Sequence, residues 1–286
     1  MTKIDTLPPR VGLSTLSKSY DVILSDIWGV VHNGVTAWPE ATGALRRFRE
    51  EGGTVVLVSN APRPNRDVKL QLDGLGVPRE AWDDVVTSGD LTRREVLGRG
   101  PVRVHHLGPH KDDYLFERIE RVGPEEADLV VATGLDDDDN ETPEDYRGRI
   151  EALRARNLEM ICANPDRVVE KGGQLIWCAG ALADMYEELG GKVLHAGKPH
   201  VPIYQAALDR ACELRGEAVP KERVMTVGDS VRTDLTGARS FGIDALFLTG
   251  GIHAGEIGDP PDPEKFSELL EGFAPVAWAY RLAWDL

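Results

Sequence analysis

Four short segments of the 286-residue sequence carry side chains suited to phosphoryl transfer, and each lies at or just beyond the end of an expected core strand. In open α/β sheets, ligands bind at the carboxyl ends of the strands. Phosphoryl transfer needs a carboxylate nucleophile, a hydroxyl and a cation for the phosphate oxygens, and carboxylates for magnesium. In chain order these are Asp26 in segment 25–30, Ser59 in 58–60, Lys198 in 197–199, and Asp229 and Asp234 in 227–234.

Each of these segments is by itself weak support for a functional site. An aspartate at a strand end is more often a helix N-cap or a turn residue than a nucleophile. A single Ser-Asn or Gly-Lys-Pro sequence is less specific still. Their combination, in this order, is what predicts phosphoryl-transfer chemistry.

The elements that position these residues alternate between strands and helices, which predicts a parallel sheet covered by helices. The expected strands are nearly all apolar, as is typical when both faces of a sheet are covered. Helical faces are expected at 41–48, before Gly52, and at 203–214, before Gly216. The pattern indicates a Rossmann-like, doubly wound α/β core with strands at 22–24, 54–58, 224–227 and 245–248.

The middle third of the chain repeats the same alternation and could be a separate α/β unit. Strands are expected at 103–107, 128–133 and 158–163, and helices at 111–121 and 143–156.

Composition excludes several classes of protein. The net charge of −15 argues against nucleic acid as a partner, since that binding depends on Lys and Arg neutralising phosphates. No stretch approaches the roughly 18 apolar residues of a membrane span, and the first ten residues lack the apolar run of a signal peptide. Three widely spaced cysteines indicate reduced, packed thiols. We therefore expect a cytoplasmic protein with no membrane partner.

The chain resembles the haloacid dehalogenase (HAD) superfamily, which consists largely of magnesium-dependent phosphatases, because the four segments look like its four motifs. The middle is similar to class IIA, the NagD-like branch, which inserts a large α/β cap between the second and third motifs. With this spacing, we expect residues 1–84 and 190–286 to form the core and residues 85–189 the cap. The similarity to class IIA rests on Thr87-Ser88-Gly89, Ala163-Asn164-Pro165-Asp166, and Cys178-Ala179-Gly180-Ala181-Leu182 leading to Gly197-Lys198-Pro199.

The resemblance implies a role for each motif residue. Asp26 would be the nucleophile that becomes an aspartyl phosphate, while Ser59 and Lys198 would hold the non-bridging phosphate oxygens. Asn60 would orient its loop or contact phosphate. Segment 163–166 would join cap to core and contribute specificity, which makes Asn164 and Asp166 candidate substrate-binding residues.

The resemblance also implies a Mg²⁺ site. Asp26 and Asp229 would supply carboxylate oxygens, Asp234 would be a further or indirect partner, and the backbone carbonyl of Trp28 would complete the protein's share. This short set is chemically sufficient, since Mg²⁺ keeps several waters and usually takes one or two carboxylates.

Trp28 departs from the family pattern, in which the first motif usually reads Asp-x-Asp and the second Asp serves as acid and base. Indole has one N–H donor and no acid or base chemistry near neutral pH. General acid–base catalysis contributes roughly 10² to 10⁴ in rate, so poor leaving groups would suffer most from its loss. The indole ring could instead narrow the pocket or stack on an aromatic substrate. His32 could be a replacement acid, although a polar turn residue is the favoured interpretation.

Two further segments have simple structural interpretations. The acidic run 136–140 is expected to be a solvated loop, because four adjacent carboxylates cannot all face one ion. Segment 275–284, which contains three aromatic residues, is expected to form a last strand or cover a sheet edge. An aromatic interface to another subunit is the alternative, so a homo-oligomer remains open.

Three functions are consistent with the sequence. The leading hypothesis is a Mg²⁺-dependent hydrolase of small phosphorylated metabolites, with the cap excluding water. A hydrolase of substrates with good leaving groups, such as acyl phosphates or phosphonates, would tolerate Trp28 better. The third is a catalytically weak protein that binds a phosphate ligand.

Overall fold

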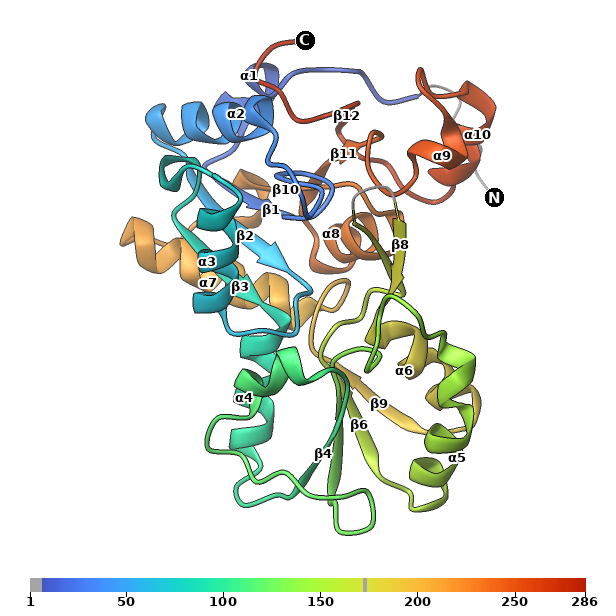
Figure 1. Ribbon diagram of the computed structural model, residues 1–286. Coiled ribbons are helices and arrows are strands. Elements are labelled where there is room, and N and C mark those ends of the chain that lie inside the picture. Colours follow the sequence, from blue (N-terminus) through green and yellow to red (C-terminus); the bar gives the residue numbers. More distant parts are fainter. Residues whose placement is uncertain (1–6, 172–173) are drawn as a thin grey trace. The chain divides into compact units, whose positions relative to one another are not determined.

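The computed structural model describes residues 7–171 and 174–286, which pack as two compact units (Figure 1). The first unit comprises residues 7–58, 70–86 and 199–286, and the second comprises residues 59–69 and 87–198. The expected domain boundaries at residues 84/85 and 189/190 remain a prediction, because the division into compact units does not show which segments fold as independent domains.

The first unit is built on a six-stranded sheet with the order β12-β11-β10-β1-β2-β3. The pairings from β12 through to β2 are parallel. The chain fills one side of β1 with β2 and β3 and then returns to the other side with β10, which makes the gap between β1 and β10 a topological switch point. The strands are β1 (Val22–Ser25), β2 (Thr54–Ser59), β3 (Asp84–Thr87), β10 (Val224–Gly228), β11 (Asp244–Leu248) and β12 (Ala277–Ala279).

Helices connect these strands as the periodicity predicts. Helix α2 begins at Pro39, whose fixed φ suits the first helical turn, and it buries Ala41, Leu45 and Phe48. Helix α7 ends where Gly216 adopts a left-handed conformation. The helices of this unit are α1 (Leu13–Leu16), α2 (Pro39–Glu50), α7 (Val201–Arg215), α8 (Thr236–Phe241), α9 (Ala254–Ile257) and α10 (Pro263–Leu269), while α3 (Asn65–Gly74) spans the boundary with the second unit.

The second unit has its own parallel sheet, with the order β4-β5-β6-β9. An antiparallel hairpin of β7 (Val168–Lys171) and β8 (Gln174–Trp177) follows β6. The other strands are β4 (Val104–Leu107), β5 (Leu129–Ala132), β6 (Glu159–Cys162) and β9 (Lys192–His195), and the helices are α4 (Ser88–Gly98), α5 (Arg147–Ala155) and α6 (Ala179–Glu188). The expected fold class of parallel sheets flanked by helices is therefore confirmed.

One expected helix is wrong. Instead of a helix over 111–121, the chain forms a 3₁₀ helix at His110–Phe116 and turns at Arg118, whose φ is 64°. The cause is Asp112, which is 3% exposed and forms an ion pair with Arg63 at 3.2 Å, so this side of the turn faces inward despite its charge. The other expected helix of this unit, 143–156, divides into a 3₁₀ turn at Pro143–Tyr146 followed by α5.

The simple structural interpretations are confirmed. Residues 136–140 form bends and a turn, with most side chains exposed. Strand β12 forms the sheet edge that we expected near the C-terminus, and Trp278 bonds to the backbone of Pro9 and Val11 on its outer side. The three cysteines are free. Within the described residues, no helix combines the length and the apolar character needed to cross a membrane.

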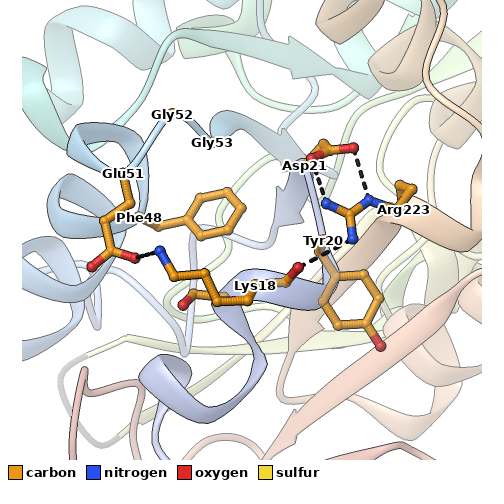
Figure 2. Close-up of a pocket in the computed structure, with 9 residues that line it drawn as sticks. Lys18, Tyr20, Asp21, Phe48, Glu51, Gly52, Gly53 and Arg223 are labelled. Carbon is orange, nitrogen blue, oxygen red and sulfur yellow. Dashed lines mark hydrogen bonds and ion pairs between the residues drawn. The ribbon is translucent and has the colours of Figure 1, made fainter.

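Figure 2 shows how the amino ends of the first unit's strands are tied together. The Arg223 guanidinium, just before β10, donates twice to the Asp21 carboxylate, just before β1, at 2.7 and 2.9 Å. It also donates to the carbonyl oxygens of Lys18 and Ser19. Lys18, Asp21 and Arg223 line a hollow of about 120 Å³ at the amino ends of the strands, opposite the ends that Asp26 follows. Because its Arg and Asp pair with each other, we assign this hollow to the framework.

His106 provides a test of how the second unit responds to acid. It lies in β4, its Nε2 is 2.9 Å from Thr133 Oγ1, and burial lowers its pKa from 6.5 to about 4. The unfolded chain therefore binds a proton near pH 6.5 that the folded chain excludes until about pH 4. Stability should be complete above pH 6.5 and should fall as the pH drops, by at most about 2 kcal/mol from His106 between pH 7 and pH 5.

Urea unfolding at pH 7 and pH 5 measures this difference. We expect His106→Gln to lose less stability than the wild type over this interval, whereas His110→Gln, at a fully exposed histidine, should behave as the wild type does. An identical pH dependence in all three proteins would contradict the assignment to His106.

Candidate active site

Three carboxylates meet inside the first unit. Asp26 follows β1, and Asp229 follows the neighbouring parallel strand β10, so both lie at the topological switch point. Asp234 lies five residues further along. Each of the three offers a carboxylate oxygen within 4.8 Å of the others, and all three are buried.

The backbone fixes the orientation of these carboxylates. The Asp26 N–H donates to Val227 O at 2.8 Å, which continues the β1–β10 pairing, and Ile27 N–H donates to Asp26 Oδ1 at 2.7 Å. Ile252 N–H donates to Asp229 Oδ2 at 2.8 Å. Ser230 N–H donates to Asp234 Oδ2 at 3.2 Å.

Asp229 lies between two glycines that leave no room for a side chain. A Cβ on Gly29 would lie 2.0 Å from Asp229 Oδ2, and a Cβ on Gly251 would lie 1.9 Å from it. Gly29 also has a φ of +76°, in the left-handed region that favours glycine. The backbone can therefore close tightly on the carboxylate from both sides.

Asp234 lies in a π-helical turn, Val231–Leu235. Such turns are rare and are found disproportionately at functional sites. The Ser230 hydroxyl caps the turn by accepting a bond from Thr233 N–H. The single Tyr204 O–H is shared between the carbonyl oxygens of Thr233 and Asp234, at 3.3 and 3.4 Å. These bonds hold the turn in place, and Asp234 is fully buried.

This carboxylate set fits a divalent cation. Carboxylates packed this closely in the interior repel each other unless a positive charge lies between them. Oxygen donors of this kind suit Mg²⁺ or Ca²⁺. Within residues 7–171 and 174–286, this is the only group of three or more acidic, His or Cys side chains close enough to share an ion.

The contacts of His32 are those of a structural residue in a turn. Its ring is 1% exposed and packs edge-on against Trp28, with the ring centroids 5.0 Å apart. Nδ1 accepts a bond from Gly34 N–H at 2.8 Å, and burial lowers the pKa of His32 to about 4. His32 is therefore neutral at pH 7 and stabilises the turn after Trp28, as the favoured interpretation predicts.

The remaining motif residues belong to the second unit. Ser59 is the last residue of β2, and its Oγ accepts a bond from Ala61 N–H. Asn60 holds the backbone of Lys198 at two points, since its Oδ1 accepts from Lys198 N–H at 2.7 Å and its Nδ2 donates to Lys198 O at 3.1 Å. Lys198 is 2% exposed. Of the two roles considered for Asn60, the contacts favour orienting the loop.

Segment 163–166 also contacts Asn60, which holds the backbone of Lys198. Asp166 Oδ1 accepts from Asn60 Nδ2 at 3.0 Å, and Asn164 Oδ1 accepts from Asp166 N–H at 3.2 Å. The Ser88 hydroxyl donates to Ala163 O. Asn164 and Asp166 therefore help to order the surroundings of Lys198, and their contact with substrate remains a prediction.

Our sequence reasoning missed the segment Gly250–His253. Its Ile252 N–H holds Asp229, and its His253 ring accepts a bond from Val231 N–H. The same rule that identified the four motifs could have found it, because Gly250-Gly251 lies just beyond the apolar strand expected at 245–248, after Thr249.

Comparisons with known proteins give consistent matches along the chain. A family model described as haloacid dehalogenase-like hydrolase matches residues 23–119, and a second, described as HAD-hydrolase-like, matches residues 195–270. The structure of a hydrolase of the haloacid dehalogenase-like family from Brucella suis 1330 is 47% identical and has a TM-score of 0.87, with 97% of this chain and 100% of that chain covered.

Two curated relatives are more distant. Ribonucleotide monophosphatase NagD of Escherichia coli (strain K12) is 25% identical over 80% of this chain and 88% of its own length. A 4-nitrophenylphosphatase of Schizosaccharomyces pombe is 22% identical over 90% of this chain and 94% of its own length.

The contact between Gly251 and Asp229 can be tested directly. In Gly251→Ala the new methyl group would displace the Asp229 carboxylate, so we expect the Mg²⁺ concentration for half-maximal thermal stabilisation to rise at least about tenfold. Gly255→Ala is the matched control, since a Cβ there would meet nothing within 4 Å. Equal Mg²⁺ responses in the two variants would contradict the candidate cation site.

Proposed function

Because the chain belongs to the haloacid dehalogenase-like hydrolase family, we propose that it is a Mg²⁺-dependent phosphatase of small phosphorylated metabolites. The observation that carries this proposal is the cluster of Asp26, Asp229 and Asp234, buried at the switch point of a parallel sheet. The curated relatives named as phosphatases of a ribonucleotide and of 4-nitrophenyl phosphate support it.

Asp26 would act as the nucleophile. Its backbone continues the β1–β10 pairing, and Ile27 N–H fixes one of its carboxylate oxygens, so little reorganisation is needed before attack. In the first step a carboxylate oxygen of Asp26 bonds to phosphorus while the bond from phosphorus to the leaving oxygen breaks. In the second step a water oxygen bonds to phosphorus while the bond from phosphorus to Asp26 breaks. Asp26 leaves as a free carboxylate, and the protons of the water stay on the released inorganic phosphate or pass to solvent.

Mg²⁺, held by Asp26, Asp229, Asp234 and the Trp28 backbone carbonyl, would supply positive charge for the phosphate oxygens when bound. Lys198 and Ser59 would bind the non-bridging oxygens of the phosphate. The two hydrogen bonds from Asn60 to the Lys198 backbone support this role, because they fix the point from which the ammonium group extends.

The second unit would contribute substrate selection through Asn164 and Asp166. Their bonds to each other and to Asn60 support this proposal, since a substrate contact made there would be coupled to the placement of Lys198. The free cysteines fit a reducing compartment, and we place the protein in the cytoplasm.

Trp28 favours a second candidate within the same chemistry, the hydrolysis of substrates with good leaving groups. The indole cannot protonate the leaving oxygen, and the neutral, buried His32 beside it does not supply that proton at pH 7. The carboxylate of an acyl phosphate or the aryl oxide of an aryl phosphate leaves without a proton, whereas a sugar alkoxide needs one.

Phosphate release from a broad panel of phosphate esters, with and without Mg²⁺, tests the proposed function. We expect turnover that requires Mg²⁺ and that falls at least about 10³-fold in Asp26→Asn, because the amide is a poor nucleophile. Turnover of no substrate above the Asp26→Asn control would overturn the phosphatase proposal and favour a protein that only binds phosphate ligands.

Trp28→Asp tests the missing acid. A carboxyl group at this position should accelerate hydrolysis of sugar phosphates by roughly 10- to 100-fold and change hydrolysis of acyl phosphates little, because only the former need the proton. The ratio of kcat/KM for the two substrate classes measures this effect. A loss of activity on both would show that the indole itself has a positive role.

A further inference from the structure

The segment Gly250–His253, which follows β11, contacts two loops of the candidate cation site at once. Its backbone holds the first loop, because Ile252 N–H donates to Asp229 Oδ2 at 2.8 Å and Gly251 lies against the same carboxylate. His253 holds the second loop, because Val231 N–H donates to His253 Nε2 at 3.3 Å.

Val231 is the first residue of the π-helical turn that carries Asp234. The first N–H groups of any helical segment have no acceptor within the segment and need one from outside. The Ser230 hydroxyl satisfies Thr233 N–H, and the His253 ring satisfies Val231 N–H. His253 therefore acts as part of the cap of this turn.

Glu256 fixes which nitrogen of His253 accepts that bond. His253 Nδ1 is 3.0 Å from Glu256 Oε2, and a carboxylate can only accept, so Nδ1 carries the hydrogen and Nε2 presents its lone pair to Val231. His253 is also the residue before α9, and its carbonyl oxygen accepts bonds from Glu256 and Ile257. Both its ring and its backbone are thus held in one orientation.

We propose that His253, oriented by Glu256, is a positioning residue that sets the spacing between Asp229 and Asp234 and thereby the affinity for the divalent cation. This inference rests on the proposed function, since it assumes that the three carboxylates bind Mg²⁺. His253 acts through the Val231 backbone and touches neither substrate nor cation. Outer partners of this kind typically change metal affinity 10- to 100-fold when they are removed.

The experiment compares Mg²⁺-dependent thermal stabilisation of the full chain in two variants. His253→Phe keeps a ring beside Phe247, from which His253 lies 6.2 Å between ring centroids, but it has no acceptor. His253→Gln can place an amide oxygen where Nε2 lies. We expect half-maximal stabilisation to need at least about tenfold more Mg²⁺ in His253→Phe, and to stay within about threefold of the wild type in His253→Gln.

A second readout separates positioning from a general structural role. At saturating Mg²⁺, kcat of His253→Phe should return to near the wild-type value, whereas KM for the phosphate ester should change little. A purely structural role would lower the metal-free melting temperature and leave the Mg²⁺ midpoint unchanged, which would overturn the proposal. His110→Phe makes the same chemical change at a fully exposed histidine of the second unit and should match the wild type throughout.

If His253→Phe does not fold, His253→Asn and His253→Gln give the same test with two polar side chains. Only Gln is long enough to reach Val231 N–H, so the Asn variant should need about tenfold more Mg²⁺, and equal midpoints would overturn the proposal. The wild type and Asp229→Asn show whether a negative result contradicts the role of His253 or the Mg²⁺ site itself. A wild type without any Mg²⁺ response overturns both proposals, whereas a response lost in Asp229→Asn but unchanged in His253→Phe overturns only this one.

Discussion

Mutual repulsion of three buried carboxylates is the interaction that the rest of the first unit must accommodate. With carboxylate oxygens within 4.8 Å of one another and an effective dielectric constant near 20, two charged carboxylates repel by at least roughly 3 kcal/mol, and three pairs act together here. Backbone N–H groups of Ile27, Ser230 and Ile252 each oppose part of this repulsion. A bound cation would remove most of the remainder, so cation binding and stability of this unit should be coupled.

The sheet order explains why these charges can meet at all. Parallel strands end at one edge, and the chain reverses its direction of winding between β1 and β10, so the segments after these two strands diverge and leave space between them. Asp26 and Asp229 lie on either side of this space. The ion pair of Arg223 with Asp21 joins the same two strands at their other ends, which keeps their register, and hence the spacing of the carboxylates, fixed.

Much of this arrangement follows from local sequence pattern. Apolar runs, typical of strands buried on both faces, predicted β1, β2 and β10. The polar residues at the ends of these runs, Asp26, Ser59 and Asp229, were therefore the candidate site residues. The expected helix over 111–121 failed because the buried pairing of Asp112 with Arg63 joins residues 49 positions apart, which no periodicity reveals. His253 was missed for a related reason, since its ring accepts a hydrogen bond from the Val231 N–H, and a backbone donor leaves no mark on side-chain identity.

Under the proposed function, Trp28 would impose a chemical constraint that a bound cation would not remove. A cation and Lys198 would stabilise negative charge on the phosphate, but neither would be the acid that protonates the leaving oxygen. His32, whose ring packs against Trp28, is neutral at pH 7 because burial lowers its pKa to about 4. Loss of an acid costs about 3 to 5 kcal/mol in activation free energy for a leaving group that needs one. Substrate choice should therefore follow leaving-group stability first and shape second, which makes the leaving oxygen's pKa the property that best orders candidate substrates.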